Sequence, residues 1–211
     1  MITVGIIGGV ASGKSTIAEK LESLGAHVFD ADEIGHQVLD ESAVIDAARG
    51  RWGDEVVDSD GRLIRSAIAA HVFAHDASPA AIAKAAQELK FWESQTHPRI
   101  TRRVAEDLRR LAEESASQKS GNRVVVLDAA VLLKAGWDGL CDQLIFVDVP
   151  QETRLKRGLA RGWSAEHFAA REAAQLPLEE KKKKATVVID NGGTLDQTYE
   201  QVLGFWQSLS G

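Results

Sequence analysis

The 211-residue chain has little that would suit an extracellular or membrane protein. Its single cysteine, Cys141, excludes an internal disulfide framework and a cysteine-rich metal site. The longest uncharged apolar runs, such as residues 124–127, are too short to cross a bilayer. The first residues carry no basic segment of the kind that begins a secretory signal. We therefore expect a cytoplasmic protein that makes no membrane contact.

The composition also lacks the bias of a disordered chain, a collagen-like fibre or a coiled-coil rod. Hydrophobic residues make up 44% and charged residues 27%, which is ordinary for a globular protein. The net charge of −6 argues against nucleic-acid binding by the whole surface, but it permits a local basic site for a phosphorylated small molecule. The length suits a single domain with room for an inserted subdomain, and a monomer is favoured.

Short β-branched, nearly continuous apolar segments predict buried parallel strands, and the connections between them are long and helix-like. The sequence therefore predicts an α/β fold with a five-stranded parallel sheet flanked by helices. Helices are expected at 67–73, 80–92, 100–114 and 195–209. The predicted strands are 3–7, 27–29, 123–127, 143–149 and 186–189. A single domain 1–211 is predicted, with a core (1–33, 121–150 and 185–211), a helical substrate-binding insertion (34–120) and an arginine-rich lid (151–184).

The sharpest motif in the chain is a phosphate-binding loop (P-loop) between the first predicted strand and helix. It is made of Gly8, Gly9, Val10, Ala11, Ser12, Gly13, Lys14 and Ser15, and it matches G-x-x-x-x-G-K-[ST]. Glycines let backbone N–H groups converge on an anion, and the helix N-terminus adds a positive dipole end. We expect Lys14 to reach the β- and γ-phosphates and the Ser15 hydroxyl to bind Mg²⁺. The alternative is a glycine-rich turn that binds nothing.

Two acidic positions follow predicted strands. Asp30 and Asp32 lie where the second strand ends, and either carboxylate could orient a substrate hydroxyl or accept its proton. The alternative is a helix cap, since Asp30 and Glu33 have capping-box spacing. Asp128 ends the third strand, as a Walker B aspartate that holds Mg²⁺ does, although a single Asp there is often a turn residue.

Basic residues gather in the predicted lid. Arg154, Arg157 and Arg161 share one helix face, where guanidinium groups suit phosphate oxygens. A solvated helix face is the alternative. Within the run Lys181–Lys184, one lysine could steady a phosphate while the others face solvent. The His97–Pro98 pair predicts a helix boundary.

At nearly full length the chain resembles the dephospho-CoA kinase family. The likeness rests on an ordered set of segments at family-like spacing, which is far more specific than the P-loop alone. These are residues 4–16, 30–38, 60–65 and 97–100, then Arg157 with Arg161, then Gln175, Lys181, Ala185 and 188–193.

The resemblance implies transfer of the γ-phosphoryl group of ATP to the ribose 3′-hydroxyl of dephospho-CoA, with Mg²⁺ as cofactor. It implies that Asp32 is the catalytic carboxylate and that Arg65 and His97 bind substrate, with Lys181 as a further substrate-side residue. Arg157 and Arg161 correspond to lid arginines around the transferring phosphate, and Lys14 completes the catalytic set. The nucleotide side comprises the P-loop through Thr16, with Asn191 near the adenine pocket.

The chain departs from the family's pattern at a few positions. Lys134 stands where an acidic residue is usual, Arg154 where Gln is frequent, Gly162 where Asp is frequent, and Thr186 follows Ala185 where Asp is usual. Two alternatives remain open: another P-loop kinase acting on a nucleoside, nucleotide or shikimate-like alcohol, and a nucleotide-dependent switch without phosphoryl transfer. The Asn-Lys-x-Asp motif of a GTPase is absent from the sequence.

Overall fold

The chain divides into two compact units, which we call the sheet unit and the helical unit. The computed structural model describes residues 1–73, 78–117, 123–129 and 132–209; the side chains at 30–32 and 116–117 are not described. The sheet unit comprises Met1–Asp30 and Leu108–Gly211, and the helical unit comprises Ala31–Asp107.

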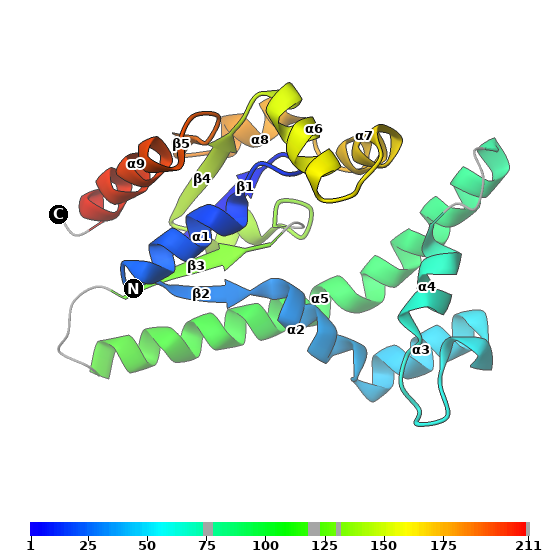
Figure 1. Ribbon diagram of the computed structural model, residues 1–211. Coiled ribbons are helices and arrows are strands. Elements are labelled where there is room, and N and C mark those ends of the chain that lie inside the picture. Colours follow the sequence, from blue (N-terminus) through cyan, green and yellow to red (C-terminus); the bar gives the residue numbers. More distant parts are fainter. Residues whose placement is uncertain (74–77, 118–122, 130–131, 210–211) are drawn as a thin grey trace. The chain divides into compact units, whose positions relative to one another are not determined.

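The sheet unit is built on a five-stranded sheet in the order β2-β3-β1-β4-β5 (Figure 1). All neighbouring strands are parallel, which confirms the predicted sheet. The register aligns the ends of β2 and β3, because Asp128 pairs with Asp30, while β1 continues for two residues beyond Ile6, the other partner of Asp128. The strands are β1 (Ile2–Gly8), β2 (His27–Asp30), β3 (Val124–Asp128), β4 (Gln143–Asp148) and β5 (Val187–Asp190).

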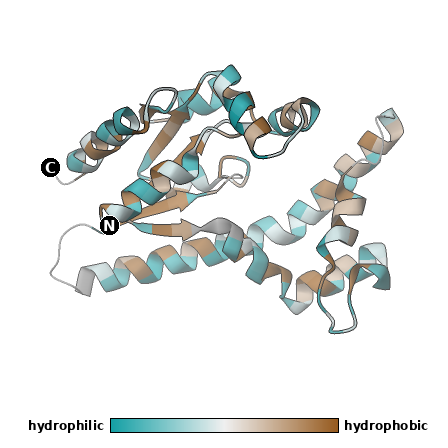
Figure 2. Ribbon diagram, viewed as in Figure 1, coloured by the Kyte–Doolittle hydropathy of each residue, from teal (hydrophilic) through white to brown (hydrophobic). Residues whose placement is uncertain are grey.

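Helices α1 (Lys14–Ser23) and α9 (Leu195–Ser208) cover one face of this sheet. Their buried side chains, such as Leu21 and Val202, form one core with alternate residues of β1, β3 and β4. The strands are accordingly hydrophobic along most of their length (Figure 2). A capping box of Thr194 and Gln197 fixes the start of α9. Leu195, in the first turn of α9, is exposed and lies outside this core.

Leu132 and Cys141, which lie between β3 and β4 in the chain, pack against Gly5 of β1. A Cβ added to Gly5 would lie 2.7 Å from Leu144 and 2.8 Å from Cys141 Sγ, so a glycine is needed for this close packing. The remaining helices of the sheet unit are η2 (Trp137–Leu140), α6 (Gln151–Ala160), α7 (Ala165–Ala173) and α8 (Leu178–Lys184). The predicted lid, 151–184, is therefore helical, as expected.

The helical unit has its own small core of Ala48, Val56, Ile68 and Val72. Between its described residues only an isolated antiparallel bridge, Val57 with Leu63, represents β-structure. Its elements are α2 (Ala31–Leu39), α3 (Ser42–Trp52), η1 (Asp54–Val56), α4 (Arg65–Val72) and most of α5 (Pro79–Ser117).

The predicted helix boundary at His97–Pro98 is wrong, because α5 runs through it without interruption. Proline removes one backbone hydrogen bond and crowds the preceding turn. Side chains before and after Pro98, such as Ala85 and Val104, are buried. Their burial offsets the lost hydrogen bond, so the two predicted helices form one continuous helix. Across the described residues, no helix combines the length and apolarity that spanning a bilayer requires.

Candidate functional site

The P-loop has the backbone shape of an anion site. Ala11 has φ +57° and Gly13 has φ +87°, two left-handed residues that bend the chain between β1 and α1. Alternation of such residues with right-handed ones makes backbone N–H groups converge into a nest. Gly13 is also the N-cap of α1, where the first N–H groups of the helix have no intrahelical partner. Lys14 begins that helix and lines a cavity with Gly8 and Lys181.

Inside this loop, the hydroxyl of Ser12 is buried and has no hydrogen-bond partner within the described part of the chain. Its backbone carbonyl, in contrast, is held from two sides: Asn191 Nδ2 donates to it at 2.8 Å and Arg157 Nη1 at 3.3 Å. Arg157 Nη2 also donates to the Asn191 carbonyl at 2.8 Å. Asn191 accepts a bond from Thr198 Oγ1 of α9 at 3.0 Å. The predicted nucleotide residue Asn191 and the lid residue Arg157 therefore lie together against the P-loop.

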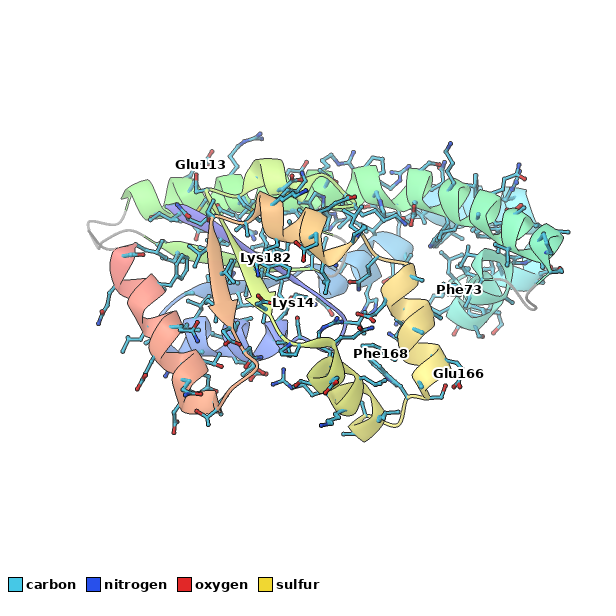
Figure 3. The ribbon with its side chains drawn as sticks, turned by 90° about the horizontal axis from the view of Figure 1, so that it is seen from above. Lys14, Phe73, Glu113, Glu166, Phe168 and Lys182 are labelled. Atoms are coloured by element: carbon cyan, nitrogen blue, oxygen red, sulfur yellow. The ribbon has the colours of Figure 1, made fainter. Side chains whose placement is uncertain are left out.

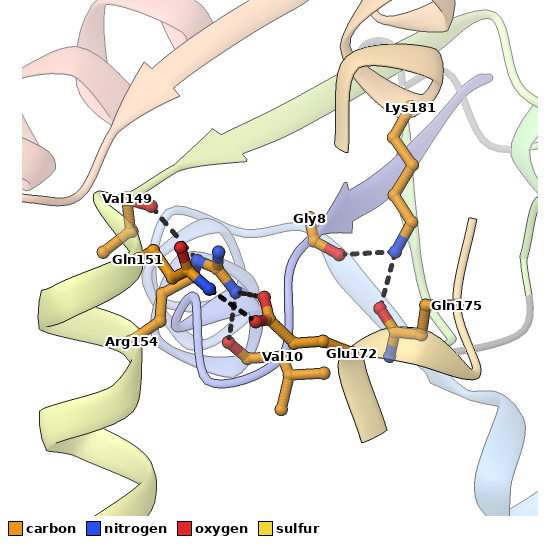
Figure 4. A network of polar contacts seen from close by, with 8 residues as sticks. All are labelled: Gly8, Val10, Val149, Gln151, Arg154, Glu172, Gln175 and Lys181. Carbon is orange, nitrogen blue, oxygen red and sulfur yellow. Dashed lines mark hydrogen bonds and ion pairs between the residues drawn. The ribbon is translucent and has the colours of Figure 1, made fainter. Parts of the chain in front are cut away.

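Lys181, which belongs to α8, contacts the first residue of the loop. Its Nζ donates to the Gly8 carbonyl at 2.9 Å and to Gln175 Oε1 at 2.6 Å (Figure 4). Burial, and next to it the charges of Lys14 and Arg154, lower the pKa of Lys181 from 10.5 to about 8. Of the lysine run, Lys181 is the buried member, while Lys182 pairs with Asp148 at 2.6 Å in an exposed position.

Arg154 makes contacts with Glu172 and Val10 that the sequence did not predict. Its side chain is 3% exposed and forms an ion pair with Glu172 of α7. Nη1 also faces the Val10 carbonyl of the P-loop, and Nε donates to the Val149 carbonyl at 3.2 Å. The sequence contains one indication that position 154 is unusual, namely an arginine where the family frequently has Gln. Glu172 lies in no recognisable motif, so nothing in the sequence indicates its role.

Arg161 lies apart from these contacts. It follows the end of α6, is exposed, and its guanidinium lies 6.0 Å from the Trp163 ring. The predicted common face of Arg154, Arg157 and Arg161 therefore holds for the first two, which both contact the P-loop. Phe168 of α7 faces α6 and packs with Val10 and Ala11 (Figure 3).

Asp128 lies half-buried at the end of β3, beside β1, the strand that leads into the P-loop. Ser15 is exposed on the first turn of α1. Among the described residues, no group of three or more His, Cys, Asp or Glu side chains gathers as a metal site. A Mg²⁺ ion on a nucleotide takes most of its ligands from phosphate and water, so one hydroxyl and one carboxylate fit it.

The other predicted site residues belong to the helical unit. Asp32 lies in the first turn of α2, and its side chain is outside the described part of the structure. Arg65 Nη1 lies 3.2 Å from His36 Nε2, which joins two of the segments that carry the family resemblance. A third is close by, since Gly35 lies beside Ile100, three residues after His97.

Two hollows of about 360 Å³ each flank the segment between α7 and α8. One is lined by Leu133, Lys134, Leu176 and Lys181 among others. The second reaches the P-loop and is lined by Gly9, Val10, Gln151, Arg154 and Glu172 among others. Lys134, the departure from an acidic residue, therefore adds positive charge to a hollow that already contains Lys181.

Comparison with known proteins agrees with this geometry. A family model described as dephospho-CoA kinase matches residues 2–197. A dephospho-CoA kinase of Carboxydothermus hydrogenoformans is 35% identical over 97% of this chain and 92% of its own length. A solved structure from Thermus thermophilus has 34% identity and a TM-score of 0.75, covering 100% of this chain and 98% of that one. The dephospho-CoA kinase of Campylobacter jejuni, at 22% identity and a TM-score of 0.62 over 99% and 97% of the two chains, shares the fold.

These likenesses extend over almost the whole chain, and they confirm the resemblance and the P-loop kinase core that the sequence predicted. They support a function in coenzyme A biosynthesis. The chain belongs to the dephospho-CoA kinase family, a family of ATP-dependent transferases.

Proposed function

We propose that this protein transfers the γ-phosphoryl group of ATP to the ribose 3′-hydroxyl of dephospho-CoA, giving coenzyme A and ADP. The observation that carries the proposal is the P-loop with its surrounding cations, in a chain that matches the family over residues 2–197. A P-loop supplies phosphate binding, and the family supplies the acceptor.

The nucleotide is held by the P-loop from Gly8 to Thr16. Converging backbone N–H groups bind the phosphates, and Lys14 neutralises charge on the β- and γ-phosphates. Lys181, which donates to the Gly8 carbonyl, adds a second cation and is proposed as a substrate-side residue. Asn191 keeps the Ser12 carbonyl in place and lies on the adenine side.

The proposed acceptor side begins at Asp32, which orients the 3′-hydroxyl and takes its proton as the new P–O bond forms. Arg65 and His97 of the helical insertion contact dephospho-CoA. Arg157 and Arg161 of the lid stabilise the charge that spreads over the transferring phosphoryl group, and the closed lid excludes water that would otherwise hydrolyse ATP. When Mg²⁺ is bound by Ser15 and Asp128, it neutralises phosphate charge.

The predicted division of labour completes the proposal: a core of 1–33, 121–150 and 185–211, a substrate-binding insertion of 34–120 and a lid of 151–184. We further propose a cytoplasmic monomer that makes no contact with nucleic acid or membrane. The substrate is a small molecule, so no partner chain is required for the reaction.

The test is incubation of the protein with ATP, Mg²⁺ and dephospho-CoA, with coenzyme A detected by mass. Nucleosides, nucleotides and shikimate serve as competing acceptors in parallel reactions. Formation of coenzyme A at the highest rate supports the proposal. A faster reaction with another acceptor, or ATP hydrolysis without any phosphorylated acceptor, overturns it.

Asp32→Asn tests the mechanism within that assay. We expect turnover to fall about 10²-fold or more, because a general base of this kind contributes that much, while ATP affinity changes little. The matched control is Asp40→Asn, which removes an exposed carboxylate just after the same helix and should leave turnover unchanged. Equal turnover in Asp32→Asn and wild type would remove Asp32 from the chemistry.

A further inference from the structure

Arg154 is the most deeply buried basic side chain beside the P-loop, and it faces the loop's backbone directly. A Cβ placed on Gly9 would lie 2.9 Å from Arg154 Nη1, so the second glycine of the loop packs against the guanidinium. Nη1 also faces the carbonyl of the next residue, Val10, at 3.5 Å. The position of this guanidinium therefore restricts where the backbone at 9–10 can lie.

Glu172 forms an ion pair with the same Nη1 that faces the Val10 carbonyl (Figure 4). The carboxylate belongs to α7, whereas Arg154 belongs to α6, so the ion pair joins the two lid helices. Gln151 Nε2 donates to the second carboxylate oxygen of Glu172 at 3.2 Å. Phe168, one turn earlier on α7, lies with its ring 5.8 Å from the Arg154 guanidinium. Arg154 thus links α7 to the P-loop.

The ion pair of Arg154 and Glu172 also affects the electrostatics around the P-loop. Arg154 and Lys14 both contribute to lowering the pKa of Lys181, whereas Glu172 acts in the opposite direction. Among the described residues in these contacts, Glu172 is the only carboxylate. A buried guanidinium without its carboxylate turns to the nearest anion, since an unpaired buried charge is strongly unfavourable. With nucleotide in the P-loop, that anion is the triphosphate.

We propose that Arg154 and Glu172 form a latch that sets the affinity of the P-loop for the triphosphate. Arg154 is a positioning residue that holds Gly9 and Val10 in their binding conformation. Glu172 restrains the Arg154 guanidinium, so that it supports the loop and does not pair with the phosphates. This inference rests on the proposed nucleotide site but not on the identity of the acceptor.

The experiment measures the Kd of Mg·ATP by calorimetry without any acceptor, for Arg154→Gln, Glu172→Gln and the double variant. Arg154→Gln should weaken binding about threefold or more, because it removes the loop's support and a nearby cation. Glu172→Gln should tighten binding by about the same factor, because the freed guanidinium reaches the triphosphate. The double variant should bind as Arg154→Gln does, because the effect of Glu172 passes through Arg154.

The direction of the change in Kd for Mg·ATP distinguishes a positioning role of the pair from a loss of structure in the variants. Loss of structure would weaken ATP binding in both single variants, and such a result overturns the latch. Tightening by Glu172→Gln of equal size with and without Arg154 would reflect simple removal of a negative charge, and it also overturns the latch. If Glu172→Gln does not fold, Glu172→Asp replaces it: the shorter carboxylate should also tighten binding, and unchanged or weaker binding contradicts the proposal.

The matched control is Arg171→Gln, which removes the arginine of α7. Arg171 contacts His167 and the Trp163 ring, and among the described residues it forms no hydrogen bond or ion pair with the P-loop. We expect its Kd for Mg·ATP to stay within about twofold of wild type. Coenzyme A formation is measured separately. If the protein forms no coenzyme A, but Arg154→Gln weakens and Glu172→Gln tightens ATP binding, the proposed acceptor is refuted and the latch is supported.

Discussion

Basic side chains have different partners in the two units of the molecule. Around the P-loop they donate mainly to backbone carbonyls: Lys181 to Gly8, and Arg157 to Ser12 and Asn191. In the helical unit they pair with carboxylates. Arg51 donates to both oxygens of Glu88, at 2.9 and 2.8 Å. Arg99 and Arg103 share the two oxygens of Glu41, each at 3.2 Å.

This difference in partners distinguishes the anion-binding region around the P-loop from the structural ion pairs of the helical unit. A carbonyl satisfies the hydrogen bonds of a cation but leaves its charge uncompensated, so the P-loop region retains a positive field that attracts an anion. A carboxylate cancels the charge locally and fixes two helices to each other. The side chain of Glu88 is 11% exposed, and hydrogen bonding from Arg51 is the main cause that lowers its pKa. A basic residue that faces carbonyls is therefore the better indicator of a functional role.

Lys14→Ala should have the largest effect. The ammonium group acts on charge that is concentrated in the transition state, so kcat/KM for ATP should fall about 10³-fold. The thermal midpoint should change little, because Lys14 lies at the start of α1 and outside the buried core. Steady-state kinetics with varied ATP, together with thermal unfolding, check both expectations. If Lys14→Ala lost much stability but kept its activity, Lys14 would have a structural role, and the contrast between the two units would be wrong.

Glu88→Gln should have the opposite profile. Glutamine keeps one acceptor oxygen but has no charge, so it cannot accept from all of the donors that Arg51 and Trp52 present to Glu88. We expect a thermal midpoint about 5 °C lower with turnover at 25 °C retained. The pKa of Glu88 is lowered in the folded state, so its stabilisation is present above the ordinary value of 4.5 and is lost as the pH falls through the lower folded value.

The pH dependence of unfolding checks this sign. The difference in thermal midpoint between wild type and Glu88→Gln should be constant at neutral pH and should decrease below about pH 4.5, where protonated Glu88 resembles glutamine. Glu113→Gln, on an exposed turn of the same long helix, is the control and should not change the midpoint. A difference that grows in acid would contradict the assignment.

The same contrast explains what could be predicted from the sequence. The P-loop is a local pattern: Gly8, Gly13 and Lys14 have fixed spacing and lie between a strand and a helix, so both the motif and its position in the fold follow from the chain alone. The five parallel strands were predictable because each is a short apolar run, and the three central strands, β1, β3 and β4, are buried along most of their length.

Contacts between distant segments were not predictable in this way. The pair of Arg154 and Glu172 joins two helices, and neither residue has a fixed spacing to the P-loop that it supports. The continuous helix α5 was missed for a related reason. The local preference of Pro98 favours a boundary, and only the burial of residues on both sides, which depends on tertiary packing, reverses it.

Lys181→Arg should have a smaller effect, visible only in alkaline solution. Because the pKa of Lys181 is about 8, its ammonium is lost on the free enzyme above that pH. We expect kcat/KM for ATP to fall with one proton and to be about tenfold below its plateau at pH 9. Arginine stays charged, so the fall should disappear in the variant. Lys182→Arg, on the exposed side of the same helix, should keep the wild-type profile; identical profiles in all three proteins would contradict a role for Lys181.

Arg49→Gln should have the smallest effect. Arg49 Nε lies 3.0 Å from Asp54 Oδ1, but the side chains are 46% and 91% exposed. An ion pair in water contributes little, since solvent screens the attraction and ordering both side chains costs entropy. We expect the thermal midpoint to stay within about 1 °C of wild type, far less than for Glu88→Gln. A shift as large as that of Glu88→Gln would show that burial is not what distinguishes the stabilising carboxylate pairs of the helical unit.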